Sequence, residues 1–132
     1  MKKEIIKTLS KIISLKEDIL FAYLHGSFLE KGNFEDIDIA VYLEDRRATQ
    51  IDIIEYEITS SLAIEKELKM PLDVKILNDA PLSFRYHVSC GLLLFSKDES
   101  KREEFLCDTW KKYFDFLPIA KLYLREALSA QI

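Results

Sequence analysis

Hydrophobic residues recur along the chain with two different periods, which indicates that helices and strands follow one another. Over residues 2–16, apolar side chains return every three or four positions and lysines occupy the other side, as in an amphipathic helix. A second stretch has the same apolar spacing at Ile51, Ile54, Ile58 and Leu62. We expect this second helix to end before Pro71, because the residue before a proline avoids helical geometry.

Four shorter apolar runs are predicted to form strands over residues 19–24, 36–43, 72–77 and 92–95. From Ile39 onward the second run has no polar alternation, which is typical of a strand that is covered on both faces. The third run alternates apolar and charged residues, so one of its faces carries charge. A turn at residues 78–81 leads from the third strand into a further helix, which Gly91 closes.

The end of the chain, from Asp98 onward, is predicted to be helical with a break at Pro118. Its apolar stripe comprises Leu106, Trp110, Tyr113 and Leu117. This order of elements predicts an α/β (α+β) fold, in which helices pack on a small mixed β-sheet and a C-terminal helical segment follows. With 132 residues, of which 48% are hydrophobic, the chain suits one domain over residues 1–132.

Composition and charge exclude several classes of protein. The net charge is −4 and the basic residues are scattered, so the basic surface of a general nucleic-acid binder is missing. Cys90 and Cys107 lack metal-ligand spacing and are flanked by apolar residues, which favours buried thiols in a reducing compartment. Neither a signal peptide nor a membrane-spanning run is apparent, so we expect a cytoplasmic protein without a membrane partner.

Asp36 and Asp38 lie at the start of the second predicted strand. Side chains two positions apart in a strand point to the same side, about 6–7 Å apart. Two like charges beside a buried strand are costly unless a cation neutralises them or they lie at a solvent-facing edge of the sheet. Asp73, on the third predicted strand, supplies another carboxylate and is the candidate to accept a nucleophile's proton. Hard oxygen ligands of this kind favour Mg²⁺ or Mn²⁺, and two such ions can promote phosphoryl displacement.

Gly26 and Ser27 form a turn between the first predicted strand and a short predicted helix over residues 28–31. Backbone N–H groups at a helix start are unpaired and suit a phosphate, which glycine allows to approach closely. The hydroxyl of Ser27 can add a further hydrogen bond. Lys31 and Lys75 are candidates to contact a triphosphate, and a solvated lysine is the alternative interpretation of each.

Taken separately, these motifs are weak signals. An Asp-x-Asp sequence is usually a solvated turn or strand end, a Gly-Ser pair is only a turn, and Asp73 alone would pair with Lys75. Their order along the chain, with each motif next to an expected strand or helix, favours a catalytic site.

The same order of motifs resembles the nucleotidyltransferase fold of the DNA polymerase β superfamily. The matching elements are His25-Gly26-Ser27, eight intervening residues, Asp36-Ile37-Asp38 and the later Asp73. In size the chain is similar to the minimal members of this family, the MNT proteins, and it resembles them further at residues 77–81, 85–91 and 113–118. Glu35 stands where a small serine is common in the family.

This resemblance implies a metal-dependent nucleotidyltransferase. Proteins of this kind resemble the antitoxin of HEPN–MNT toxin–antitoxin pairs, in which the MNT protein transfers AMP from ATP to a tyrosine of the HEPN ribonuclease and so silences it. The cofactor would be Mg²⁺ (or Mn²⁺), the substrate ATP, and the partner a HEPN toxin in a hetero-oligomer. The implied nucleotide-binding residues are Gly26, Ser27 and Lys31, and the implied catalytic and metal-binding residues are Asp36, Asp38 and Asp73.

Two alternatives remain open at this point. One is a catalytically degenerate MNT antitoxin that blocks its toxin by stoichiometric binding. The other is a nucleotidyltransferase that acts on a small hydroxylated molecule. Enzymes of the latter kind usually carry a second substrate-binding domain, for which 132 residues leave little room.

Overall fold

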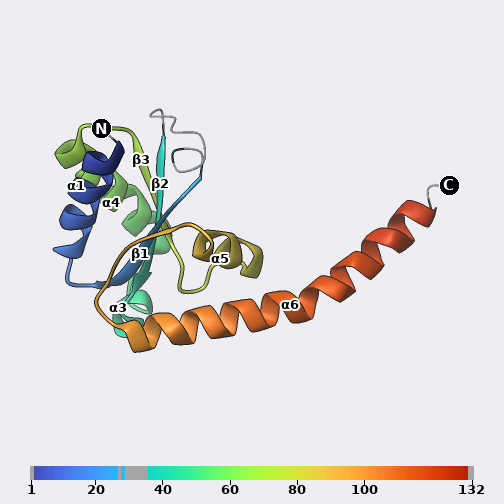
Figure 1. Cartoon of the computed structure of the whole chain (residues 1–132). Coiled ribbons are helices and arrows are strands. Elements are labelled where there is room, and N and C mark those ends of the chain that lie inside the picture. Colours follow the sequence, from blue (N-terminus) through green and yellow to red (C-terminus); the bar gives the residue numbers. More distant parts are fainter. Residues whose placement is uncertain (1, 27, 29–35, 131–132) are drawn as a thin grey trace.

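The computed structural model describes residues 2–26, 28 and 36–130. Along the chain the elements are α1 (Lys2–Ser14), β1 (Ile19–His25), β2 (Ile37–Leu43), α3 (Asp45–Ala48), α4 (Ile53–Leu68), β3 (Leu72–Ile76), α5 (Leu82–Ser89), β4 (Leu92–Ser96) and α6 (Glu99–Ala130) (Figure 1). The predicted mixed α/β fold is confirmed. Each of the four predicted strands is found, with one end shifted by a single residue.

The four described strands form one mixed sheet in the order β3-β2-β1-β4. β1 pairs antiparallel with both β2 and β4, whereas β2 and β3 are parallel and α4 lies between them in the sequence. The two central strands, β1 and β2, are buried along most of their length, as the lack of polar alternation predicted for β2.

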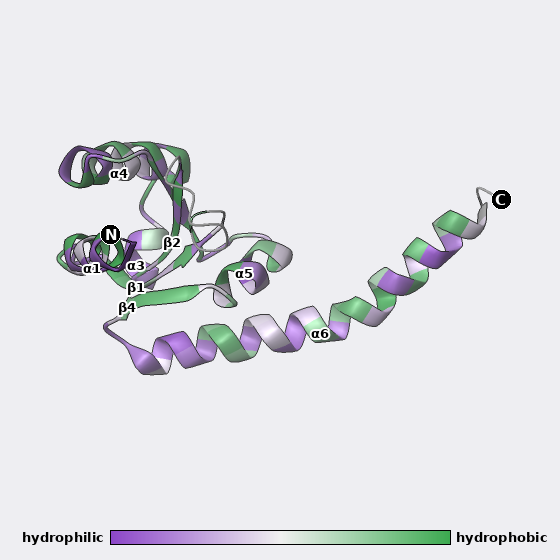
Figure 2. Ribbon diagram, turned by 45° about the horizontal axis from the view of Figure 1, so that its top comes forward, coloured by the Kyte–Doolittle hydropathy of each residue, from purple (hydrophilic) through white to green (hydrophobic). Residues whose placement is uncertain are grey.

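Helices cover both faces of this sheet. On one face, Leu9 of α1, Ile64 of α4 and Ile39 of β2 belong to the larger buried cluster. On the other face, Val88 of α5 and Phe105 of α6 belong to a second buried cluster. Figure 2 shows these two layers, with α1 and α4 on one side of the strands and α5 and α6 on the other.

The apolar stripe that was predicted for α4 does not face the core. Three of its residues, Ile54, Ile58 and Leu62, are more than half exposed. The helix turns another row toward the sheet, consisting of Glu57, Ser61 and Glu65. Each side chain of this row accepts a hydrogen bond of 2.9 Å from a backbone N–H of β3, the strand at the sheet edge. The predicted helix is present, and it turns this polar row inward because the edge strand needs acceptors for its outward N–H groups, which the apolar spacing in the sequence does not reveal.

α6 is one continuous helix that projects beyond the body of the molecule (Figure 1). It passes through Pro118, where the sequence predicted a break. A proline removes one helical hydrogen bond, and a helix can accommodate that loss by bending, as α6 does in its second half. Phe105 in the first half is buried, whereas the second half exposes Ile119, Leu122, Tyr123, Leu124 and Leu128.

The cysteines also differ from the prediction. Cys90 and Cys107 are free thiols that are exposed, because Cys90 ends α5 and Cys107 lies on the outer side of α6. Among the described residues, no helix combines the length and the apolar character that crossing a membrane requires.

Candidate active site

Strand pairing brings three of the chemically active side chains into one row. Asp38 of β2 is the direct partner of His25 in the antiparallel β1–β2 pair and of Asp73 in the parallel β2–β3 pair. Residues that are direct partners in a sheet project from the same face. The row His25–Asp38–Asp73 therefore crosses three adjacent strands, and it lies on the face that α5 and α6 cover, since the alternate residues Ile37 and Ile39 belong to the opposite cluster.

Asp36 lies just outside β2, one residue before the strand begins, and is exposed. It was predicted to be the first residue of the strand and to share the side of Asp38. Its charge still acts on Asp38, because repulsion from Asp36 contributes to the raised pKa of the Asp38 carboxyl. The predicted site residues Ser27 and Lys31, together with Glu35, lie outside the described residues.

Gly26 follows β1 directly and brings the turn close to Asp38. Its φ angle of +83° lies in the left-handed region that favours glycine. A Cβ atom at this position would lie 2.5 Å from Oδ2 of Asp38, so any larger residue would collide with the carboxylate. The structure thus gives a specific reason for glycine in the predicted phosphate-binding turn.

The row carries negative charge with little compensation. Burial raises the pKa of Asp38; the charge of His25 opposes this rise, while Asp73 and Asp36 add to it. Burial lowers the pKa of His25 from its ordinary value of 6.5, while the charges of Asp38 and Asp73 oppose this lowering. Among the described residues, the buried Nε2 atom of His25 has no hydrogen-bond partner.

Lys75 lies beside the row on β3. Its Nζ atom is 3.8 Å from Oδ2 of Asp73 and 3.9 Å from Oε1 of Glu57. The pairing of Asp73 with Lys75 that the sequence suggested is therefore present, and Glu57 of α4 extends it. Because the Lys75 side chain is about half exposed, the ion pairs hold it in place only weakly.

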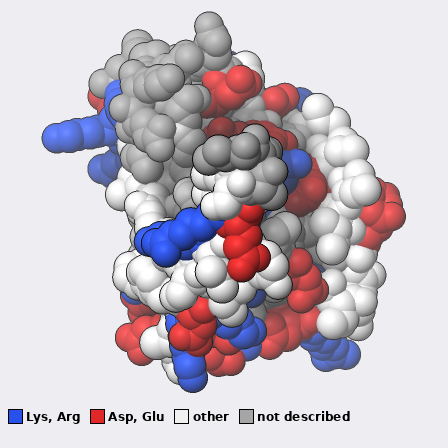
Figure 3. Space-filling view, turned by 90° about the vertical axis from the view of Figure 1, so that its right-hand side faces the viewer, with Lys and Arg blue, Asp and Glu red and all other residues white. Residues whose placement is uncertain are grey.

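Acidic side chains are prominent on the side of the molecule toward which α6 projects, where several lie set back from the surface (Figure 3). In the part of the chain that the structure describes, no group of three or more His, Cys, Asp and Glu side chains is already arranged around a metal position. The ligand type nevertheless fits a divalent cation, because Asp38 and Asp73 offer hard oxygen atoms and repel each other without one.

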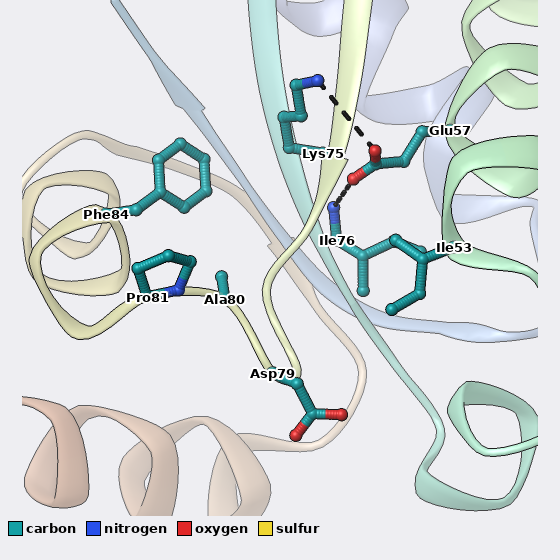
Figure 4. A pocket seen from close by; sticks show the side chains of 8 residues that line it. All are labelled: Ile53, Glu57, Lys75, Ile76, Asp79, Ala80, Pro81 and Phe84. Atoms are coloured by element: carbon teal, nitrogen blue, oxygen red, sulfur yellow. Dashed lines mark hydrogen bonds and ion pairs between the residues drawn. The ribbon is translucent and has the colours of Figure 1, made fainter.

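A pocket of about 410 Å³ adjoins the row, and sequence reasoning did not find it. It is bounded by α4, β3 and the turn that leads into α5 (Figure 4). The lining residues are Ile53, Glu57, Lys75, Ile76, Asp79, Ala80, Pro81 and Phe84. Phe84 connects the pocket to the row, since its ring meets the ring of His25 edge-on at 5.5 Å. No short sequence motif predicts this pocket. The only related signal was the loop at residues 77–81, which resembles MNT proteins and supplies part of the lining.

Several solved structures resemble this fold over almost its whole length. One is a chain of the complex of tri-AMPylated Shewanella oneidensis HEPN toxin with MNT antitoxin, which is 20% identical, with 97% of this chain and 99% of that chain covered and a TM-score of 0.72. A toxin–antitoxin structure with AMP-PNP is 20% identical over 92% of this chain and 96% of that chain, with a TM-score of 0.71. A third, the toxin–antitoxin MntA-HepT, is 21% identical over 96% of each chain, with a TM-score of 0.66.

At the level of sequence, no curated protein matches the chain significantly. The family model for polymerase beta, nucleotidyltransferase, matches residues 7–100. This range contains Gly26, Asp36, Asp38 and Asp73, together with all four described strands. The chain belongs to the polymerase β nucleotidyltransferase family, as the order of its motifs predicted.

Proposed function

We propose that this protein is a metal-dependent nucleotidyltransferase that transfers AMP from ATP to a tyrosine hydroxyl of a HEPN toxin and thereby acts as the toxin's antitoxin. The observation that carries this proposal is the row of Asp38 and Asp73 beside the Gly26 turn. Two structures of similar fold support the choice of reaction, since one contains a tri-AMPylated HEPN toxin and another contains AMP-PNP.

The turn after β1 is the proposed triphosphate site. Gly26 allows a phosphate to approach the backbone, because it has no side chain and adopts a left-handed φ angle. Ser27 and Lys31 are assigned to the same site on the basis of the sequence motif. Their hydroxyl and ammonium groups are suited to phosphate oxygen atoms.

Asp36, Asp38 and Asp73 would hold the divalent cation, Mg²⁺ or Mn²⁺. When bound, such an ion neutralises phosphate charge and stabilises the oxygen atoms between which the phosphoryl group is transferred. The raised pKa of Asp38 supports a cation here, because Asp73 and Asp36 repel the charge of this carboxylate and burial disfavours it.

The chain's own residues orient the reaction and move the proton. The tyrosine oxygen would attack the α-phosphorus of ATP, forming an O–P bond while the bond to the bridging oxygen breaks and pyrophosphate leaves. In this proposal Asp73 takes the phenolic proton. Its position supports the role, because it is the outermost carboxylate of the row and lies on the opposite side of Asp38 from Gly26. Lys75 lies 3.8 Å from Asp73 and adds one positive charge beside that carboxylate.

The test combines the protein with Mg²⁺, labelled ATP and the HEPN protein encoded beside its gene. We expect the HEPN protein to become labelled, and we expect the double variant Asp36→Asn, Asp38→Asn to lower the rate by at least about 10²–10³-fold. Asp115→Asn is the matched control, because Asp115 is an exposed carboxylate on α6. Equal labelling by the double variant and the control would contradict the proposed activity.

One observation favours a second candidate, a binding-only antitoxin. The described carboxylates do not form a ready-made cluster of three ligands, and Asp36 is exposed. If inhibition depended on binding alone, the double variant would neutralise toxin ribonuclease activity as well as the wild-type protein does. If transfer is required, only proteins that label the toxin will neutralise it.

A further inference from the structure

The pocket between α4, β3 and α5 has the walls of a site for an aromatic side chain. Its apolar surface comes from Ile53, Ile76, Pro81 and Phe84, which belong to three different parts of the fold. Phe84 faces the cavity in Figure 4 and offers an aromatic partner for a ring. The volume of about 410 Å³ falls in the usual range of small-ligand sites, about 300–1,000 Å³.

The charges in this pocket argue against a phosphorylated group. Glu57 and Asp79 contribute two carboxylates, whereas Lys75 contributes one ammonium group, which Glu57 already approaches to 3.9 Å. A triphosphate in this position would meet more negative than positive charge. A neutral phenol meets no such penalty, and its hydroxyl can form a hydrogen bond with one of the charged groups.

The position of the pocket relative to the row identifies which substrate would enter it. In an in-line displacement, the attacking and leaving oxygen atoms lie on opposite sides of the phosphorus. The proposed triphosphate turn at Gly26 is at the β1 side of Asp38, so pyrophosphate leaves toward β1 and the attacking hydroxyl approaches from β3. The pocket lies on that β3 side, where Lys75 both lines it and contacts Asp73.

We infer that this pocket is the acceptor subsite, which receives the aromatic side chain of the tyrosine to be modified and directs its hydroxyl toward Asp73. This inference rests on the proposed function and adds to it the place where the acceptor binds. In the same arrangement, Phe84 couples the acceptor to the row, because its ring contacts His25.

The test fills the pocket without disturbing the buried core. Ile53 lines the pocket and is 45% exposed, so Ile53→Trp adds volume at a position where the chain tolerates it. Ile54 is the matched control, since it is the next residue on α4, is 69% exposed and does not line this pocket. We expect Ile53→Trp to lower kcat/KM for the HEPN protein by at least about 10-fold, while Ile54→Trp keeps the wild-type value.

A second pair of variants and a binding measurement separate the acceptor from the nucleotide. Ile53→Glu places a carboxylate in the apolar wall, with Ile54→Glu as its control, and we expect the same loss for the HEPN protein. AMP-PNP should bind all four variants with the wild-type Kd, as measured by calorimetry. A weaker AMP-PNP affinity in the Ile53 variants, with an unchanged KM for the HEPN protein, would place the nucleobase in the pocket and overturn the inference.

The remaining outcomes are equally decisive. Labelling by the wild-type protein with unchanged kcat/KM in both Ile53 variants would reject the acceptor subsite and leave the proposed transferase activity standing. Absence of labelling by the wild-type protein, despite AMP-PNP binding, would reject both the activity and the subsite. Circular dichroism and urea unfolding of each variant establish that a loss does not come from misfolding.

Discussion

Burial raises the pKa of Asp38, and repulsion from Asp73 and Asp36 adds to this effect against the opposing charges of His25 and Lys75. A carboxyl group whose pKa is raised on folding destabilises the folded chain when it is ionised. The negative charge of Asp38 suits a cation site, but without the cation it lowers the free energy of unfolding. Similar opposition between stability and activity is common where function requires clustered charges.

Replacing this carboxylate should stabilise the metal-free protein. We expect Asp38→Asn to increase the free energy of unfolding at neutral pH by about 0.5–1 kcal/mol, because it removes a partly buried and repelled charge whose interactions solvent screens in part. The folded pKa lies above the ordinary value of 3.8, so the penalty develops as pH rises through the folded pKa and is absent in acid, where wild type and variant converge. Urea unfolding with a chelator, at neutral and at acid pH, measures this difference.

The exposed Asp115→Asn variant serves as the control for this measurement as well. It should leave the unfolding midpoint unchanged at either pH, within the range usual for surface substitutions, about 0.5 kcal/mol. A midpoint for Asp38→Asn that stays equal to that of wild type at neutral pH would contradict the electrostatic interpretation of the row.

At the scale of elements, α4 covers the edge of the sheet with side-chain acceptors. An open strand edge is a site where another chain can pair, and polar groups at the edge are one means of closing it. The Glu57, Ser61 and Glu65 side chains close the outer edge of β3 in this way, each with a bond of 2.9 Å. This arrangement holds the strand that carries Asp73 and Lys75.

Removing one acceptor should weaken the fold. Ser61 accepts the N–H of Val74 at 2.9 Å, and that bond is buried. We expect Ser61→Ala to lower the free energy of unfolding by about 1–3 kcal/mol, because the Val74 N–H is left without an acceptor. The measurement is the urea unfolding midpoint of the variant and of wild type.

Thr59→Ala is the control for the Ser61 experiment. Thr59 lies on the exposed side of the same helix, where its hydroxyl donates to Glu55 O at 2.9 Å and so bonds only within α4. Its removal should change the free energy of unfolding by less than about 0.5 kcal/mol. Equal destabilisation by the two variants would mean that the hydrogen bond from the Val74 N–H to Ser61 contributes nothing to stability beyond the change in helix propensity.

At the scale of the whole molecule, α6 divides into a packed half and a projecting half. The packed half contacts α5, where Tyr113 stacks on Tyr86 with ring centroids 3.8 Å apart and Trp110 Nε1 donates to Ser89 Oγ at 2.8 Å. Arg85 adds an ion pair to Asp108 at 3.3 Å. The projecting half carries exposed apolar side chains from Ile119 onward.

The two halves should contribute differently to stability. We expect a chain that ends after Leu117 to unfold within about 1 kcal/mol of the full chain, because the removed residues are exposed. A chain that ends before Trp110 should lose about 2–5 kcal/mol, since it lacks the contacts with α5. Thermal unfolding followed by circular dichroism measures both, and a large loss for the longer chain would show that the projecting half stabilises the body.

The sequence by itself determined the kinds of elements and the order of the motifs. The strand period of two and the helical period are local properties of the chain, and they were sufficient to predict the mixed sheet. The family was predicted from the resemblance of the motifs at Gly26, Asp36, Asp38 and Asp73 to nucleotidyltransferases. The charged face of β3, with Asp73 and Lys75 exposed between buried neighbours, was also visible in the alternation of residues.

Only the tertiary structure decided how these parts meet. Strand register, which depends on partners far apart in the sequence, places Asp38 between His25 and Asp73. The need to satisfy an edge strand turned the isoleucine stripe of α4 outward. The helix α6 continues through Pro118 and accommodates the lost hydrogen bond by bending. The acceptor pocket arises from three separate segments, so its apolar walls exist only after folding brings Ile53 and Phe84 to the same cavity.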